Sequence, residues 1–161
     1  MRETPIYQTW QRGECEISTD PARLDMDVTY KFLSEEAYWS PGVPREIVER
    51  AIGNSMVFGV YKAGAQAGLA RVVSDKATFA WICDVFVLPE QRGQGLGKWL
   101  MECVTSHPDL QGLRRMVLAT RDAHGLYAQY GFTPLEDPTR FMVRRKASPS
   151  PSRSLPTPPQ Q

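Results

Sequence analysis

The 161-residue sequence is short of cysteine, of long apolar runs and of any excess of charge. No apolar stretch approaches the roughly 20 residues of a membrane-spanning helix, and the polar start MRETPIYQTWQRGE lacks a signal-peptide core. The 19 Lys and Arg residues nearly balance 18 Asp and Glu residues, so no basic field favours nucleic acid or an anionic membrane. We therefore expect a cytoplasmic protein with neither a nucleic-acid nor a membrane partner.

The three cysteines, Cys15, Cys83 and Cys103, are widely spaced and form neither a metal-type pair nor a CxxC motif. This spacing indicates reduced thiols and no bound metal. Neither Cys83 nor Cys103 has an activating neighbour in the sequence, so both are interpreted as packing residues rather than nucleophiles.

The length fits one domain followed by a tail. From residue 147 the chain reads ASPSPSRSLPTPPQQ, which has no aromatic residue and too little apolar area to offset the entropy of ordering. We expect a folded domain over residues 1–146 and a disordered Pro/Ser-rich tail over 147–161.

Within the domain, hydrophobic patterning predicts an α/β protein in which strands and helices are interspersed. Asp27 is the expected cap of the first helix, Pro44 stands where the first turn of the second begins, and Gly131 ends the last. Helices are also expected over 95–106 and 122–130. The expected strands are 7–17, 56–61, 67–73, 78–88, 115–119 and 141–145, the last of which closes the sheet.

The loop after the longest strand pattern carries the first functional signal. The sequence VFVLPEQRGQGLGKWL, residues 85–100, leads from a buried strand through three alternate glycines into an amphipathic helix. Glycines let the backbone approach a ligand closely, and the free amides and dipole of a helix start attract an anion. This arrangement is typical of a pyrophosphate site, to which Arg92 and Lys98 add positive charge.

Two common nucleotide motifs do not fit this loop. A Walker loop needs glycine where Arg92 stands and a hydroxyl residue where Trp99 stands. The dinucleotide fingerprint needs a third glycine at Lys98. Arg92, Gly95 and Gly97 instead match the R/Q-x-x-G-x-G/A pattern of the GNAT superfamily of N-acetyltransferases.

A second segment strengthens this resemblance. Residues 117–132, VLATRDAHGLYAQYGF, resemble the GNAT pattern of a strand, a short helix carrying a tyrosine and a closing Gly-Phe. Tyr127 stands four residues before Gly131, as the general-acid tyrosine of the family does. The resemblance extends over most of 7–146 and is greatest with compact bacterial-type members whose acceptors are unassigned.

The resemblance implies a mixed, mostly antiparallel sheet flanked by helices and splayed between its fourth and fifth strands. It also implies acetyl-CoA as cosubstrate, with the backbone near Phe86 and Val87 holding the acetyl and pantetheine groups, and it suggests a homodimer. The implied pyrophosphate-binding residues are Arg92, Gly93, Gln94, Gly95, Leu96, Gly97 and Lys98.

An ammonium acceptor must lose a proton before it attacks a thioester, so the site needs a general base. Asp84 is the first candidate, because a charge inside the apolar run ICDVFV must be either paired or functional. A purely structural salt bridge is its alternative role. His124, one turn before Tyr127, is the second candidate, and an ordinary surface histidine is the alternative there.

The first two helices and neighbouring strands supply the expected acceptor pocket. Aromatic and acidic residues together favour a small amine with an apolar part as the acceptor. The alternatives are a protein N-terminus or lysine as acceptor, an acetyl-CoA sensor without turnover, and an unrelated phosphate-binding protein. The expected pocket residues are Tyr30, Phe32, Glu35, Glu36, Tyr38, Trp39, Phe79 and Trp81.

Overall fold

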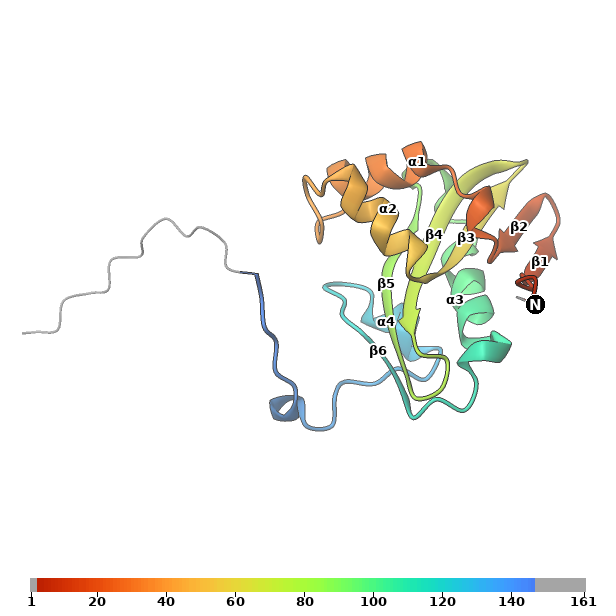
Figure 1. Ribbon diagram of the computed structural model, residues 1–161. Helices are drawn as coiled ribbons and strands as arrows, with labels where there is room; N and C mark the ends of the chain where they lie inside the picture. Colours follow the sequence, from red (N-terminus) through yellow and green to blue (C-terminus); the bar gives the residue numbers. More distant parts are fainter. Residues whose placement is uncertain (1–2, 147–161) are drawn as a thin grey trace, which may run out of the picture.

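The computed structural model describes residues 3–146 and is built on one sheet of six strands (Figure 1). Neighbours are antiparallel except the last two, which are parallel, and this mixed sheet flanked by helices confirms the predicted fold class. The predicted tail, residues 147–161, lies outside the described residues. In sheet order the strands are β1 (Thr9–Arg12), β2 (Cys15–Ser18), β3 (Met56–Lys62), β4 (Ala65–Ser74), β5 (Phe79–Val87) and β6 (Arg115–Leu118).

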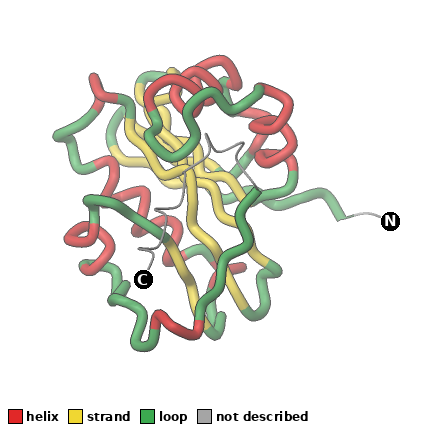
Figure 2. Tube along the Cα trace, turned by 90° about the vertical axis from the view of Figure 1, so that its left-hand side faces the viewer, coloured by secondary structure: helices red, strands yellow, loops and turns green. Residues whose placement is uncertain are grey.

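Helices cover both faces of the sheet (Figures 1 and 2). On one face lie α1 (Met26–Lys31), its π-helical continuation η2 (Phe32–Glu36) and α2 (Arg45–Gly53). On the other lie α3 (Leu96–Ser106) and α4 (His124–Ala128). Val57 and Phe58, consecutive in β3, belong to the two different cores, as the alternation of side chains along a strand requires.

The predicted first strand, 7–17, is wrong in detail, because the structure has the hairpin β1–β2 there. Gly13 makes the turn with φ of 58°, a left-handed conformation that favours glycine. The register pairs Arg12 with Cys15 at the turn. The predicted strand therefore contributes two strands to the sheet rather than one.

The helix starts lie close to the predicted positions. Asp25, not Asp27, caps α1, because its side chain accepts hydrogen bonds from the amides of Asp27 and Val28. Pro44 is the residue before α2 rather than part of its first turn. Helix α4 is shorter than predicted, and Gly131, with φ of 87°, follows in the turn beyond it.

The predicted closing strand, 141–145, does not form. After the 3-10 turn η5 (Pro138–Arg140) the backbone is extended at Phe141 but pairs with no strand in residues 3–146. Pro134 and Pro138 lack amide hydrogens, so the chain between β6 and this segment cannot form a continuous ladder. Strand β6 thus remains the edge of the sheet.

Strands β5 and β6 diverge, and this divergence positions the site. Their parallel pairing begins at Phe79 with Arg115 and ends at Ile82 with Leu118, whereas β5 continues to Val87. The sheet is therefore open beyond Ile82, as the predicted splay requires. In this numbering the splay lies between β5 and β6, because the hairpin adds a strand at the start.

Candidate active site

A β-bulge marks the start of the splay in β5. Leu69 of β4 faces Phe86 and Arg71 faces Cys83, so Ala70 alone stands opposite both Asp84 and Val85. Asp84 has φ of 49°, a left-handed value that is uncommon for a residue other than glycine. The bulge therefore gives the Asp84 carboxylate a direction that a regular strand would not.

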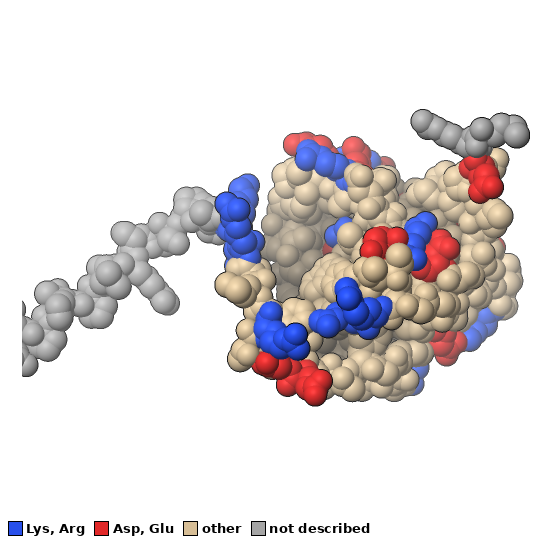
Figure 3. Space-filling model, turned by 60° about the horizontal axis from the view of Figure 1, so that its bottom comes forward, with Lys and Arg blue, Asp and Glu red and all other residues tan. Residues whose placement is uncertain are grey.

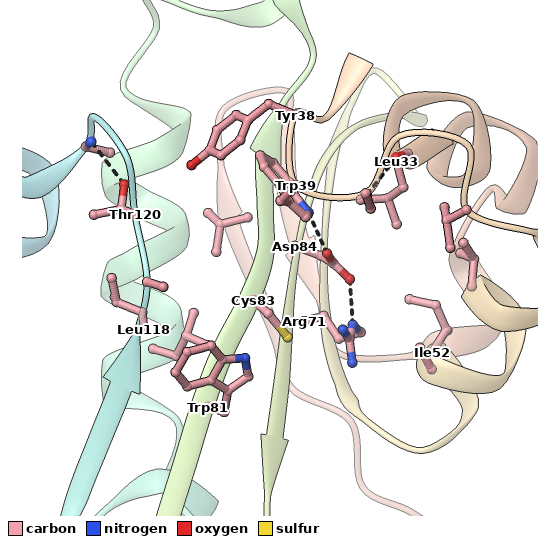
Figure 4. Close-up of a pocket in the computed structure, with 18 of the residues that line it drawn as sticks. Leu33, Tyr38, Trp39, Ile52, Arg71, Trp81, Cys83, Asp84, Leu118 and Thr120 are labelled. Carbon is pink, nitrogen blue, oxygen red and sulfur yellow. Dashed lines mark hydrogen bonds and ion pairs between the residues drawn. The ribbon is translucent and has the colours of Figure 1, made fainter. Parts of the chain in front are cut away.

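The Asp84 carboxylate is held on both oxygens (Figure 4). Arg71 Nε donates to Oδ2 over 2.7 Å, and Trp39 Nε1 donates to Oδ1 over 2.8 Å. Arg71 is fixed in turn, because its Nη1 donates to Ser55 Oγ over 3.1 Å. The Asp84 and Arg71 side chains are only 13% and 17% exposed, so this is a largely buried ion pair. The structural salt bridge, which sequence analysis gave as the alternative role of Asp84, is therefore present.

A cavity of about 460 Å³ lies beside this ion pair, on the side of the sheet covered by α2. Its wall is mainly apolar and aromatic, and its polar groups come from both sides of the splay. Such walls with few polar groups are typical of small-molecule sites. The residues that determine its chemistry are Trp39, Arg71, Trp81, Asp84, Thr120, Asp122 and Tyr127.

Tyr127 of α4 reaches this cavity although its side chain is largely buried, with 9% exposed. Its ring packs edge-on against Phe132, with the ring centroids 6.0 Å apart. Burial raises the pKa of the phenol, and the nearby Tyr38 and Asp122 add to that rise. The hydroxyl therefore keeps its proton at neutral pH, as a proton donor must.

His124 lies elsewhere. It is the first residue of α4, its side chain is exposed, and it is not among the residues that line the cavity. Of the three predicted catalytic residues, the structure brings Asp84 and Tyr127 to one cavity and leaves His124 outside it.

Next to the cavity, contacts join two loops, one of which supplies the lining residue Tyr38. The Tyr38 hydroxyl accepts a hydrogen bond from the Arg121 amide over 3.2 Å. The Arg121 guanidinium lies over the Tyr38 ring at 3.8 Å from its centroid. Because Tyr38 follows η2 and Arg121 follows β6, the pair spans the two sides of the splay.

The predicted acceptor residues are only partly in place. Tyr38, Trp39 and Trp81 line the cavity, whereas the side chain of Phe32 stacks on Phe86 in the core, with ring centroids 3.9 Å apart. Tyr30, Glu35, Glu36 and Phe79 do not line the cavity. Sequence reasoning missed Arg71 and Asp122, and the only available signal for Arg71 was a cation inside the strand pattern AGLARVV.

The glycine loop has the geometry of an anion cradle. Gly93 and Gly95 have φ of 79° and 77°, and a Cβ at Gly93, Gly95 or Gly97 would meet no atom within 4 Å. Gly95 is the N-cap of the eleven-residue helix α3. Within residues 3–146, the amides of 93–98 find no hydrogen-bond acceptor. These amides are free to bind an anion, so the loop fits a pyrophosphate.

Cationic and polar side chains surround this loop. Lys62 of β3 donates to Gln94 Oε1 over 2.6 Å, which places an ammonium group beside the cradle that sequence reasoning did not include. Arg92 Nε donates to the Val87 carbonyl over 3.0 Å, and the Lys98 side chain is exposed. Leu96, by contrast, is buried in the core and can offer only its backbone amide.

The backbone at the end of β5 faces the open edge. The Leu88 amide donates to the Ala67 carbonyl of β4 over 2.8 Å. Because peptide groups alternate along a strand, the Phe86 amide also points to β4 and the Val87 amide points into the splay. Val85, which sequence reasoning did not single out, shares the direction of Val87.

The cysteines are not arranged for nucleophilic catalysis. Burial raises the pKa of the Cys83 thiol to about 11 and that of Cys103 to about 12. Cys83 lines the cavity, yet its thiol stays protonated at neutral pH. Covalent transfer through Cys83 is therefore disfavoured, in agreement with its interpretation as a packing residue.

These features have counterparts in known proteins. The acetyltransferase (GNAT) domain family matches residues 53–134, which include both the loop and Tyr127. The chain belongs to the GNAT acetyltransferase family. Its sheet, splay and glycine loop are those of an acyltransferase enzyme, and the family uses acetyl-CoA as the acyl donor.

Several relatives of this GNAT protein are similar over most of their length. A protein of Gibberella zeae, named as a putative acetyltransferase, is 33% identical over 76% of this chain and 80% of its own length. The crystal structure of a GNAT-family protein of Xanthomonas campestris is 50% identical, covers 84% of this chain and 96% of its own, and superposes with a TM-score of 0.81.

A more distant structure shares the fold alone. It is a GNAT acetyltransferase of Elizabethkingia anophelis with acetyl-CoA bound, 15% identical over 76% of this chain and 78% of its own, with a TM-score of 0.57.

Residues 3–146 of the present protein contain neither a membrane-spanning helix nor a cluster of metal ligands. No helix there is long and apolar enough to cross a bilayer, and no three His, Cys, Asp or Glu side chains form a metal-binding group.

Proposed function

We propose that this GNAT protein transfers an acetyl group from acetyl-CoA to the primary amine of a small molecule with an apolar part. The observation that carries the proposal is the single cavity at the splay, to which Asp84 and Tyr127 both contribute. The amine would attack the thioester directly while both substrates are bound. Holding the two together supplies much of the acceleration, since the reaction becomes effectively unimolecular.

Binding of acetyl-CoA is assigned to the glycine loop and the open end of β5. The free amides of 93–98 and the cations Lys62, Arg92 and Lys98 would hold the pyrophosphate. Bound acetyl-CoA supplies an activated acetyl thioester. The Val87 amide, and with it Val85, would donate to its carbonyl oxygen, which stabilises negative charge there without a charged side chain.

Asp84 is proposed to accept the proton of the incoming ammonium, directly or through a water. Each carboxylate oxygen holds one donor in the structure, and a carboxylate has about four acceptor sites, so a site remains on each oxygen. Trp39 and Arg71 fix the orientation of the group beside the cavity. Asp84 then has two roles, as structural ion pair and as proton acceptor.

Tyr127 is proposed to give its proton to the sulfur of the departing thiolate. Its raised pKa keeps the phenol protonated, and its hydroxyl has no hydrogen-bond partner within residues 3–146. A proton donor that lines the cavity suits this role. His124, exposed and outside the cavity, has no part in the proposed mechanism.

The acceptor class follows from the cavity wall. Trp39, Trp81 and the aliphatic side chains of α2 favour an apolar body, and Asp84 with Asp122 favours a cationic head. The Tyr38–Arg121 contact links the two sides of the splay next to the cavity, and we expect this connection to favour a small molecule over a folded protein surface.

The test is a panel of amines assayed with acetyl-CoA for thiol release and for the acetylated product by mass spectrometry. We expect turnover with arylalkyl or alkyl primary amines and none with the matching tertiary amines. Peptides with a free N-terminus or a lysine form the comparison arm. Turnover restricted to peptides would refute the acceptor class, and the absence of acetyl-CoA binding in thermal melts would refute the function itself.

A further inference from the structure

Gly68 in β4 is the glycine whose missing side chain makes room for another strand's backbone. A Cβ at Gly68 would lie 2.5 Å from the carbonyl oxygen of Phe86 and 3.3 Å from the Cα of Val87. Of the twelve glycines, all within the described residues, ten would place a Cβ in open space, and at Gly59 it would meet only the Tyr61 side chain. Carbon and oxygen do not approach to 2.5 Å without repulsion, so any side chain at position 68 displaces the end of β5.

The carbonyl that Gly68 accommodates belongs to the peptide group whose N–H is proposed to hold the acetyl thioester. A peptide group is planar, so the Phe86 carbonyl and the Val87 N–H point in opposite directions and turn together. The register pairs Gly68 with Val87 and Leu69 with Phe86, which directs the carbonyl toward β4 and the N–H into the splay. Pressure on the carbonyl therefore changes the direction of the N–H.

The residues on either side of this peptide group are held in place. The Phe86 ring stacks on Phe32, with the ring centroids 3.9 Å apart. The Leu88 amide donates to the Ala67 carbonyl over 2.8 Å. Because both flanks are held, a Cβ at Gly68 would turn the peptide group rather than shift the whole strand.

The end of β5 yields to such pressure more readily than β4 does. Gly68 is buried, and β4 lies between β3 and β5 in the sheet. On the other side of β5, pairing with β6 ends at Ile82. β6 is itself the edge strand, and the last described segment stands away from the body with a hollow between them (Figure 3). The peptide group would therefore turn toward the splay, where the thioester is proposed to lie.

We propose that Gly68 is a positioning residue of the acetyl transfer. The absence of a side chain lets the Phe86 carbonyl lie against β4, and this aims the Val87 N–H at the carbonyl oxygen of the acetyl thioester. Gly68 acts through the peptide group of its neighbouring strand and contributes no group of its own to the chemistry. This role rests on the proposed function, and it adds to that function a residue outside the glycine loop and the cavity.

The test variant is Gly68→Ala, and the matched control is Gly59→Ala. Gly68 is not among the glycines with positive φ, so alanine can adopt its backbone conformation and tests the available space alone. At Gly59 in β3 the added methyl would meet the hydroxyl end of Tyr61, away from the end of β5. One extra methyl costs less than the stability of an ordinary domain, so both variants should fold and bind acetyl-CoA, as circular dichroism and thermal melts with ligand check.

The first readout needs no acceptor amine. Infrared spectroscopy with isotope-labelled acetyl-CoA measures the stretching frequency of the bound acetyl carbonyl, which falls when a hydrogen bond polarises the carbonyl. We expect a lowered frequency in the wild type and in Gly59→Ala, and a frequency close to that of free acetyl-CoA in Gly68→Ala. A folded Gly68→Ala protein with the wild-type frequency would overturn the role of Gly68 and leave the proposed function intact.

The second readout is steady-state kinetics with an identified acceptor. Gly68→Ala should lower kcat by about 10²-fold, the loss that a misplacement of about 1 Å can cause, while KM for acetyl-CoA changes little. Gly59→Ala should keep the wild-type kcat. A raised KM with unchanged kcat in Gly68→Ala would refute the positioning role. Failure of the proposed function looks different, because the wild type itself would then not bind acetyl-CoA, and both proposals would fall together.

Discussion

Replacing Tyr127 by phenylalanine removes one hydroxyl and keeps the ring that packs against Phe132. Because the hydroxyl has no hydrogen-bond partner within residues 3–146, the substitution breaks no bond of the fold, and the melting temperature should hardly change. The binding affinity for acetyl-CoA should also be retained, since the proposed pyrophosphate cradle lies in the glycine loop and the first turn of α3.

The expected loss is in the chemical step. A general acid is worth roughly 10²–10⁴-fold in rate, and a thiol with a pKa of about 8.5 leaves readily, so we expect the lower end of that range. A 10²-fold loss corresponds to about 2.7 kcal/mol of transition-state stabilisation. The loss should appear in kcat with KM nearly unchanged, because the phenolic proton is needed only as the thiolate departs.

The pH dependence gives a second readout with a definite sign. Burial raises the pKa of Tyr127, so the protonated, active form persists through neutral pH and is lost only as the pH rises through that raised pKa. The wild-type rate should therefore fall on the alkaline side, and Tyr127→Phe should lack that limb.

Steady-state kinetics with an identified acceptor provide the assay. The control is Tyr130→Phe, whose hydroxyl donates to the Lys98 carbonyl over 2.8 Å and which does not line the cavity; its kcat should stay near that of the wild type. A folded Tyr127→Phe enzyme with wild-type kcat and an unchanged alkaline limb would show that Tyr127 is not the proton donor.

Three further substitutions test other parts of the site. Gly95→Val should weaken acetyl-CoA binding, as measured by thermal melts with ligand. The control is Gly112→Val, which has a similar φ of 70° and no neighbouring atoms, and which should cost comparable stability without changing the affinity for acetyl-CoA. Equal affinities of the two variants would show that the loop does not bind acetyl-CoA. Asp84→Asn should lower kcat/KM. It should also destabilise the fold by about 3 kcal/mol in urea titrations, because it leaves Arg71 buried without its charge partner. The control Ser55→Ala removes only a neutral hydrogen-bond partner of Arg71 and should destabilise the fold less. Cys83→Ser should retain turnover, in line with a thiol whose pKa is about 11, and loss of kcat in a folded variant would revive a covalent route.

The parts of the site that sequence could predict are those whose geometry is local. The glycine loop and the start of α3 are adjacent in the chain, so glycine spacing alone determines a cradle of free amides. Tyr127 and Gly131 are likewise one short helix apart. The helix and the turn after it fix the relative position of Tyr127 and Gly131, independently of the rest of the fold.

The Asp84 cluster could not be predicted in this way. Trp39 and Arg71 reach Asp84 from the loop after η2 and from β4, and their meeting depends on the register of two strands. Sequence indicated only that a carboxylate inside an apolar run needs a partner or a function. The position of His124 also depended on where α4 begins, which differs from the predicted start by two residues.

The closing strand shows a further limit of sequence patterns. Residues 141–145 have the apolar content of a strand, yet strand formation also needs a partner edge, which the pattern does not supply. Within residues 3–146 this segment pairs neither with β6 nor with any other strand.

The bulge at Asp84 connects the architecture of the protein to its chemistry. Ile82 lies in the core beneath α3 and Phe86 lies in the core beneath α1 and α2, although residues four apart in a regular strand share a face. The extra residue reverses the alternation between them. It thereby seats Phe86 against Phe32, and it directs the Val87 amide into the splay while Asp84 lines the cavity. Packing of the first two helices and the proposed placement of the acetyl group therefore depend on the same local irregularity, which explains why an uncommon positive φ is kept at a residue that is not glycine.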